Sequence, residues 1–423
     1  MNSTGHTAHR APTDWRTAAL QKRIRARYAA ERRFRLMGLA AVWLSAGFLA
    51  FLLASMLLQG ASGFRETRIA LPIDLAAAKL PIDRTRLAGR GADLALAGAG
   101  LENAVDVAAG KALGAGGADM ISDGAWLVVR DAVKRDPSLL DRRTVIAVPA
   151  SSPIDIAAKH DGDPAAESAV ARLQARGMLS SGLNLGFLTG ADSTDAARVG
   201  IWGAFKGSLL TMIVTLALAF PIGVLSALYL EEYAPRNRWT DLIEVSINNL
   251  AAVPSIIFGL LGLAVFLGTF LLPRSAPLVG GLTLALMTMP VIVIAGRNAI
   301  KAVPPSIRDA ALGVGASPVQ VVFHHVLPLA LPGILTGTII GMARALGETA
   351  PLLMIGMRAF IAAPPGGLDD PATVLPVQIF LWSDEVSRGF VEKTSAAIIV
   401  LLVFLLAMNG VAIYLRNRFE TRW

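Results

Sequence analysis

The sequence predicts an all-α polytopic membrane protein with six transmembrane helices and one mixed α/β insert outside the membrane. The chain has 423 residues, is 54% hydrophobic and has a mean hydropathy of +0.56. A chain this apolar exceeds what one soluble core can bury. Uncharged blocks of about 18 residues or more are long enough to cross a bilayer as helices. Six such blocks are present, the fifth interrupted by one charged pair: 37–59, 207–230, 245–272, 275–296, 327–357 and 394–415.

A basic segment, residues 1–36, precedes the first predicted span at 37–59. It contains nine Lys or Arg residues and two acidic residues, which supply +7 of the chain's net charge of +8. Positive residues are retained on the cytoplasmic side, so this charge indicates a cytoplasmic N-terminus beside anionic lipid headgroups, and not nucleic-acid binding. The first apolar block has 23 residues. Since this is longer than the apolar region of a signal peptide, we expect a membrane span.

Residues 60–200 form an insert that we expect to lie outside the cytoplasm, because the first helix leads the chain outward. From residue 60 to 206 the chain carries seventeen basic and seventeen acidic residues and is neutral. Two patches rich in Val and Ile, at 126–129 and 144–148, predict a small mixed α/β domain. The insert contains neither a phosphate-binding loop nor a dinucleotide-binding glycine pattern. We expect His160 to lie at the surface and not to bind a metal.

Five further spans are predicted within residues 201–416, the membrane core of the chain. Charges in the short loops favour six crossings in total, with both termini in the cytoplasm and residues 417–423 as a cytoplasmic tail. The third span contains Asn249 and is broken just before Ser255. Polar groups inside a span are tolerated where neighbouring helices or cavity water satisfy them. These two residues are therefore candidates either for hydrogen bonds between helices or for the lining of a substrate pathway.

A polar loop at residues 304–328 joins the fourth predicted span to the fifth. Ser306, after two prolines, predicts the N-cap of a short helix, and Gly315 predicts the turn that follows it. A Ser-Pro pair beginning at Ser317 predicts a second helix start, which we expect Pro328 to end. The loop is thus predicted to contain two short helices around a glycine turn.

The fifth predicted span carries two charges in otherwise uncharged sequence, Arg344 and Glu348. On a helical wheel they share an arc of roughly 80° with Gly333, Gly337 and Gly341. Glycines at this spacing let two helices approach closely in lipid, so we expect this face to pack against protein. Charges there must face the bundle interior or a watery path. The pair is therefore a candidate for anion binding in the substrate pathway, and the alternative is a structural ion pair.

The loop and the helix after it resemble a known pattern, carried by these residues: Asp309, Ala310, Ala311, Gly315, Leu327 and Pro328. The pattern resembles the cytoplasmic EAA loop of ABC-importer permeases, the segment that docks onto their ATPase. The sequence over about 200–415 is similar to the A-type permease subunits (PstA) of bacterial phosphate ABC importers. Two residues depart from the family pattern: Asp309 stands in place of Glu, and His325 in place of an aliphatic residue.

The resemblance implies an ABC-importer permease core that moves inorganic phosphate across the bacterial inner membrane. It implies a second homologous permease subunit, a cytoplasmic ABC ATPase dimer and an extracytoplasmic phosphate-binding protein as partners. It also implies the residues of the ATPase-coupling loop: Arg308, Asp309, Ala310, Ala311 and Gly315. A permease for another oxyanion, such as sulfate, molybdate or phosphonate, would share every helix argument. An ion-coupled secondary transporter would need internal repeats or further intramembrane acids, and the sequence shows neither.

The sequence gives no pattern for catalysis. It contains no cysteine, no nucleophile elbow, no HExxH motif and no ATP-binding loop. His324 and His325 are adjacent on a predicted helix, about 100° apart, so they cannot chelate one metal from the same face. We therefore expect a transport subunit that is not an enzyme and holds no cofactor or metal, with energy supplied by a partner.

Overall fold

The computed structural model describes residues 17–78, 80–82, 91–159, 162–358 and 360–419. Its contacts divide the chain into two units, Met1–Met56 and Leu57–Trp423, which are described separately. His160, for which a surface position was predicted, lies outside the described residues, as do residues 1–16 and 420–423.

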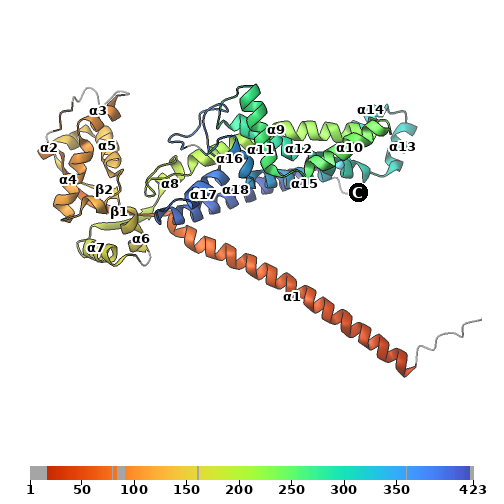
Figure 1. The fold of residues 1–423 in the computed structure, drawn as a ribbon, viewed down its shortest axis with the longest axis horizontal. Coiled ribbons are helices and arrows are strands. Elements are labelled where there is room, and N and C mark those ends of the chain that lie inside the picture. The colour runs from red at the N-terminus through yellow and green to blue at the C-terminus, as the bar shows by residue number, and fades with distance from the viewer. Residues whose placement is uncertain (1–16, 79, 83–90, 160–161, 359, 420–423) are drawn as a thin grey trace, which may run out of the picture. The chain divides into compact units, whose positions relative to one another are not determined.

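Helix α1 (Ala18–Gly63) joins the predicted basic segment and the first span in one helix (Figure 1). At 1.5 Å per residue its 46 residues extend roughly 70 Å, about twice the thickness of the hydrocarbon core of a bilayer. The Arg and Lys residues between 22 and 35 lie at angles all round this helix, so they do not form a single basic face.

The insert is built on a three-stranded antiparallel sheet in the order β2-β1-β3. Its strands are β1 (Arg65–Asp74), β2 (Arg143–Pro149) and β3 (Leu179–Leu183). In the central strand Ile69, Leu71 and Ile73 are buried, as the two-residue period of a strand with one core face requires. Ile69 pairs with Val148 of β2 and with Leu179 of β3.

Helices surround this sheet and complete its apolar core. They are α2 (Leu75–Ala78), α3 (Ala92–Gly98), α4 (Leu101–Leu113), α5 (Ala125–Arg135), α6 (Ser152–Lys159) and α7 (Pro164–Ala175), with short 3₁₀ turns η2 (Ala118–Met120) and η3 (Pro137–Asp141). Helix α8 (Leu185–Thr189) follows β3 and packs instead in a separate apolar cluster, through Phe187. In α4 the buried residues recur every fourth position from Leu101 to Leu113, which is one face of a helix. Of the two Val-rich patches, 126–129 lies in helix α5 and 144–148 in strand β2.

A buried ionic cluster joins the insert to the last helix of the chain, α18 (Gly389–Phe419). Lys159 Nζ lies 2.6 Å from Asp155 Oδ2 and 3.3 Å from Glu392 Oε2. Lys393, which is 2% exposed, donates from Nζ to the carbonyl oxygen of Gly63 at 3.0 Å. Because each ammonium has an oxygen partner, the cluster can stay buried at this join.

The membrane core contains ten α-helical segments after the insert, with π-helical turns between some of them, in the part of the chain that the structure describes. They are α9 (Trp202–Leu228), η4 (Tyr229–Tyr233), α10 (Arg238–Ala251), α11 (Ser255–Gly262), η5 (Leu263–Thr269), α12 (Pro277–Lys301), α13 (Pro305–Gly313), α14 (Pro318–Gln320), η6 (Val321–Val326), α15 (Leu327–Gly347), α16 (Ala350–Met354), α17 (Leu375–Ser383) and α18.

Helix α12 is the centre of this bundle and packs against both α9 and α15 (Figure 1). Small residues permit the close approach on the α9 side. A Cβ built on Gly296 would lie 2.8 Å from the Cβ of Ala227, and one built on Gly223 would lie 2.8 Å from Ile292 Cγ2. Such contacts are tighter than side chains tolerate, so glycine is required at both positions.

Five helical segments among the described residues are long and apolar enough to cross a membrane. They begin at Leu20, Trp202, Pro277, Pro318 and Gly389. The third predicted span, 245–272, appears instead as a pair of helices, 238–251 and 255–269, bent by 100° at the break between them. Counting that pair as one crossing gives six; counted strictly, the number is five.

Candidate functional site

The loop at 304–328 folds as two helices around a tight turn, as predicted. Gly315 in the turn has φ +91°, and no atom lies within 4 Å of a Cβ built on it. The backbone conformation alone therefore requires glycine there. Helix α14 starts with a capping box in which Ser317 Oγ accepts from the Gln320 N–H and Gln320 Oε1 accepts from the Ser317 N–H. These two features fix the path of the chain from α13 into α14.

Two details of the loop differ from the prediction. The N-cap of α13 is Pro304 and no side chain caps the helix, so the prediction of Ser306 as N-cap was wrong. The prediction that Pro328 ends the second helix was also wrong, because 318–347 is one helical segment. Proline donates no backbone hydrogen bond, and its ring clashes with the preceding turn of a regular α-helix. The π-helical turn η6 comes just before Pro328, and its wider turn accommodates the proline.

One side of the loop is exposed and mixes small, apolar and acidic residues. Val314 is 85% exposed and Leu312 50% exposed, which is unusual for apolar side chains with no partner. Ala311 faces the other way and is buried against the bundle. We define the docking face as six of the exposed residues of this loop: Asp309, Ala310, Leu312, Val314, Val319 and Phe323.

Arg308, predicted as a coupling residue, points toward the bundle and not outward from the docking face. Its Nη2 lies 2.7 Å from Oε1 of Glu232, in the turn η4 that directly follows α9. Its Nη1 and Nη2 donate to the carbonyl oxygens of Val303 and Ile300 at 2.7 Å and 3.0 Å. These are carbonyls at the C-terminal end of α12, where a cation is favourable. Arg308 thus ties α13 to both α9 and α12.

A second arginine, Arg297 of α12, completes a charge cluster at the same end of the bundle. It pairs through Nε with Glu231 of η4 and through Nη2 with Glu244 of α10, the latter at 2.7 Å. Lys301 Nζ lies 3.4 Å from the same Glu231 carboxylate. We define the inner cluster as these six residues: Glu231, Glu232, Glu244, Arg297, Lys301 and Arg308.

Sequence reasoning missed the inner cluster because it treated the charges at the ends of the spans only as signals of topology, and Arg308 only as a coupling residue. A signal was present: Glu231 and Glu232 directly follow one span, while Arg297 and Lys301 end another. Opposite charges at the same end of two spans can pair if the helices are neighbours. The sequence does not say which helices are neighbours, and the structure does.

The pair Arg344 and Glu348 is present, with Arg344 Nε 3.5 Å from Glu348 Oε1. One feature of the prediction was wrong. Helix α15 ends at Gly347, and Glu348 has extended backbone, so the span predicted over 327–357 is not one helix. The Arg344 side chain is 47% exposed within this chain, against 18% for Glu348, so the guanidinium is not buried here. The contact is therefore a long, partly open ion pair.

The glycine face of α15 packs against α12, which confirms that it contacts protein. A Cβ on Gly333 would lie 2.7 Å from Ala299 Cβ, and one on Gly337 would overlap the Ala295 methyl group. Gly341 lies against Val291 and Thr288, one and two turns further along α12. The spacing of the three glycines along α15 thus matches three residues of one neighbouring helix.

Asn249 and Ser255 lie on either side of the bend between α10 and α11. Asn249 is exposed, and no residue of α10 is buried within this chain. Ser255 begins α11, whose Gly259 packs closely on Pro351 of α16. Because α16 starts two residues after Glu348, the structure places Ser255 and Glu348 on adjoining elements. No interaction within the described residues joins Asn249 to the other three candidates.

No group of three or more His, Asp or Glu side chains in the described residues is arranged to hold a metal ion. His324 and His325 both lie exposed on the π-helical turn η6.

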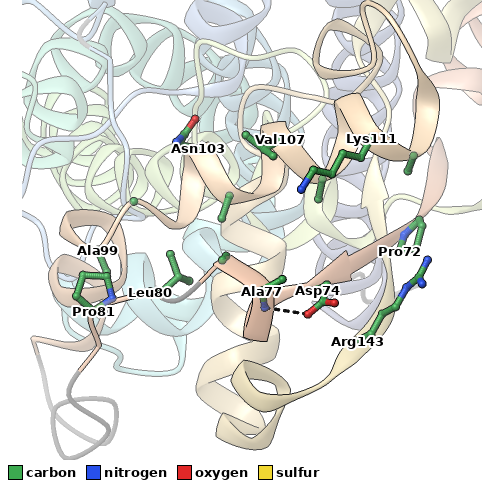
Figure 2. Close-up of a pocket in the computed structure, with 15 residues that line it drawn as sticks. Pro72, Asp74, Ala77, Leu80, Pro81, Ala99, Asn103, Val107, Lys111 and Arg143 are labelled. Atoms are coloured by element: carbon green, nitrogen blue, oxygen red, sulfur yellow. Dashed lines mark hydrogen bonds between the residues drawn. The ribbon is translucent and has the colours of Figure 1, made fainter.

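A groove of about 630 Å³ lies in the insert, between α4 and the end of β1. Figure 2 shows the residues that line it. Its rim includes Lys111, Arg143 and Asp74, and Asp74 Oδ1 accepts from the Ala77 N–H at 3.0 Å. The residues that line this groove include none of the predicted site residues.

Two family models match the chain. Residues 21–168 match a domain of unknown function, DUF3333. Residues 219–422 match the family described as "Binding-protein-dependent transport system inner membrane component". The matched residues include the docking face, the inner cluster and α15.

Individual relatives also match part of the chain. A probable ABC transporter permease protein, YqgI, from Bacillus subtilis is 35% identical over 41% of this chain and 58% of its own length. The phosphate transport system permease protein PstA 1 of Mycobacterium tuberculosis is 35% identical over 37% of this chain and 51% of its own. The phosphate transport system permease protein PstA of Haemophilus influenzae is 28% identical over 54% of this chain and 79% of its own length. The chain spans about half the length of the first two relatives.

Two solved structures are also similar in part. An inward-facing MetNI methionine ABC transporter has a TM-score of 0.38 at 18% identity, covering 52% of this chain and 95% of that one. A bacterial ABC transporter for the import of alginate has a TM-score of 0.39 at 18% identity, and the match covers 52% of this chain and 79% of that one. Residues 219–422 are thus similar to binding-protein-dependent transport system inner membrane components, and relatives named PstA match part of the chain.

Proposed function

We propose that this chain is a permease subunit of an ATP-driven importer that moves inorganic phosphate across the bacterial inner membrane. The observation that carries the proposal is the docking face, which is exposed and continues without a break into membrane helix α15. The relatives named as phosphate permeases support phosphate as the substrate. The chain holds no cofactor and hydrolyses no ATP; a partner hydrolyses it.

The proposed transporter contains three kinds of partner. A cytoplasmic ABC ATPase dimer binds the docking face, where Val314 and Leu312 would lose their exposure to water. A second, homologous permease subunit covers α10, which has no buried residue within this chain. An extracytoplasmic phosphate-binding protein delivers the substrate. Lipid surrounds the remaining apolar helix faces.

The proposed topology has six crossings and both termini in the cytoplasm. It counts the bent pair, 238–251 and 255–269, as one broken crossing. Irregular backbone at membrane depth is tolerated where it is buried in protein or lines a watery cavity, and the interface with a second permease would supply both. The insert at 60–200 then lies outside the cytoplasm, on the side opposite to the docking loop at 304–328.

The proposed anion pathway runs past Arg344, Glu348, Asn249 and Ser255. A guanidinium can bind a tetrahedral oxyanion through two parallel hydrogen bonds. The exposure of Arg344 within this chain leaves its donors open, and its ion pair at 3.5 Å is weak enough to be exchanged for substrate. Arg344→Gln should abolish uptake while the chain still inserts and binds its partners. Uptake at the normal rate would exclude Arg344 from the pathway.

Reconstitution tests the function directly. The chain, a second permease, the ATPase and the binding protein in proteoliposomes should import phosphate only when ATP is present. Competition with sulfate, molybdate and phosphonate separates phosphate from another oxyanion, because only the true substrate should block uptake at low concentration. Uptake that needs an ion gradient and no ATPase would instead show a secondary transporter and contradict the proposal.

A further inference from the structure

Arg297 is shared by two carboxylates that differ strongly in exposure. The Glu231 side chain is 11% exposed, as is Arg297 itself, whereas the Glu244 side chain is 41% exposed. A buried pair is costly to break, because the partner left behind is uncompensated. An exposed pair is weak and easily exchanged for water. Arg297 therefore has one permanent partner and one that can leave.

Glu244 is also the one described residue of α10 with a recorded ion pair. The helix lies against α12, yet none of its residues is buried. Its C-terminal end leads into the 100° bend before Ser255. Helix α10 is thus held by that bend, by the packing of Ile247 on the bundle and, at its middle, by the contact between Glu244 and Arg297.

The inner cluster connects this contact to the docking loop. Glu231 and Glu232 are adjacent in η4; the first binds Arg297, and the second binds Arg308 of α13. A displacement of α13 would therefore be transmitted through these adjacent acids to Arg297. When Glu244 leaves, Arg297 keeps Glu231, so no buried charge is left without a partner.

We propose that Glu244 and Arg297 form a latch that holds α10 against α12 in the state seen here and opens in the opposite state of the transport cycle. The inference rests on the proposed function for its role in transport. Glu244 is a positioning residue in this scheme: it sets the place of α10, and with it the place of Asn249 at the bend.

The chain contains no cysteine, so single labels can be introduced without a background. Spin labels at Arg238→Cys and Ala302→Cys, both exposed and near the latch, report the separation of α10 from α12 in the full chain in lipid nanodiscs. Glu244→Gln should raise the population with the longer distance by about two- to five-fold, the range expected for loss of a partly exposed ion pair. Asp241→Asn, an exposed acid on the same helix with no recorded ion pair, is the matched control and should change nothing.

In the assembled transporter, trapping the ATPase with ATP should lengthen the same distance, and Glu244→Gln should lower the phosphate imported per ATP hydrolysed by a similar factor. An identical distance distribution for the Glu244→Gln, Asp241→Asn and unmodified chains would overturn the latch. The distance measurement needs no substrate, so a chain that carries no phosphate would refute the proposed function and leave the latch to be judged by the distances alone.

Discussion

Two glycines of the docking loop offer a comparison in which only the backbone conformation differs. Gly313 and Gly315 each have no atom within 4 Å of a built Cβ, so alanine fits sterically at both. Gly315 has φ +91°, and Gly313, the last residue of α13, does not have a positive φ. Alanine at Gly315 should therefore cost about 1–2 kcal/mol of backbone strain. Alanine at Gly313 should be neutral or stabilise by about 0.5–1 kcal/mol, because helical glycine is unfavourable.

The functional consequence follows from the size of that strain. About 1–2 kcal/mol reduces the population of the native turn relative to alternatives by roughly 5- to 30-fold. Since the turn places α13 relative to α14, Gly315→Ala should lower phosphate uptake in proteoliposomes and lower the coupling of ATP hydrolysis to transport. Gly313→Ala should keep both. If the two variants transport equally well, the turn does not position a docking surface, and the reasoning fails.

Three further predictions concern the packing around the site. Arg308→Met leaves the mostly buried carboxylate of Glu232 unpaired and should lower the free energy of unfolding by about 3 kcal/mol, measured by thermal unfolding in detergent. Adding Glu232→Gln should restore part of the lost stability. Gly337→Val should cost about 1–3 kcal/mol through overlap with Ala295, and Ala295→Gly should rescue it. Burial raises the pKa of Asp192, although the indole N–H of Trp382 opposes this, so the folded state favours the neutral acid. The contribution of Asp192 to stability should be greatest at acid pH, and it should be lost as the pH rises from about 4 through the raised pKa of the folded state. Trp382 emission during unfolding should show this pH dependence, and Asp192→Asn should remove it.

The features that depend on local sequence could be predicted. Gly315 in the turn and the helix start at Ser317 follow from residue type alone, since few residues suit those backbone positions. The face carrying Gly337 was predicted to contact protein because close packing in lipid needs small residues. Each of these predictions uses information contained in a few consecutive positions.

The features that depend on neighbours could not be predicted. The inner cluster requires knowing that the ends of α9, α10, α12 and α13 meet, and no local pattern states it. The end of α15 at Gly347 was missed because apolar sequence resumes at 350–357, just after Glu348, so hydropathy shows one span. The prediction that Pro328 ends a helix was wrong because the rule holds for a regular α-helix. The π-helical turn before Pro328 cannot be recognised from composition.

Cross-linking from Val314 tests the central claim most directly, because this residue lies on the docking face and is 85% exposed. In the naturally cysteine-free chain, Val314→Cys carries the only thiol, and Val145→Cys in the insert, 64% exposed, is its control. The account predicts that, in the assembled transporter, Val314→Cys cross-links to the ATPase and reacts with reagents from the cytoplasmic side, while Val145→Cys does neither. Reaction of Val314→Cys from the outside alone, or a cross-link to the ATPase from Val145→Cys in its place, would contradict it.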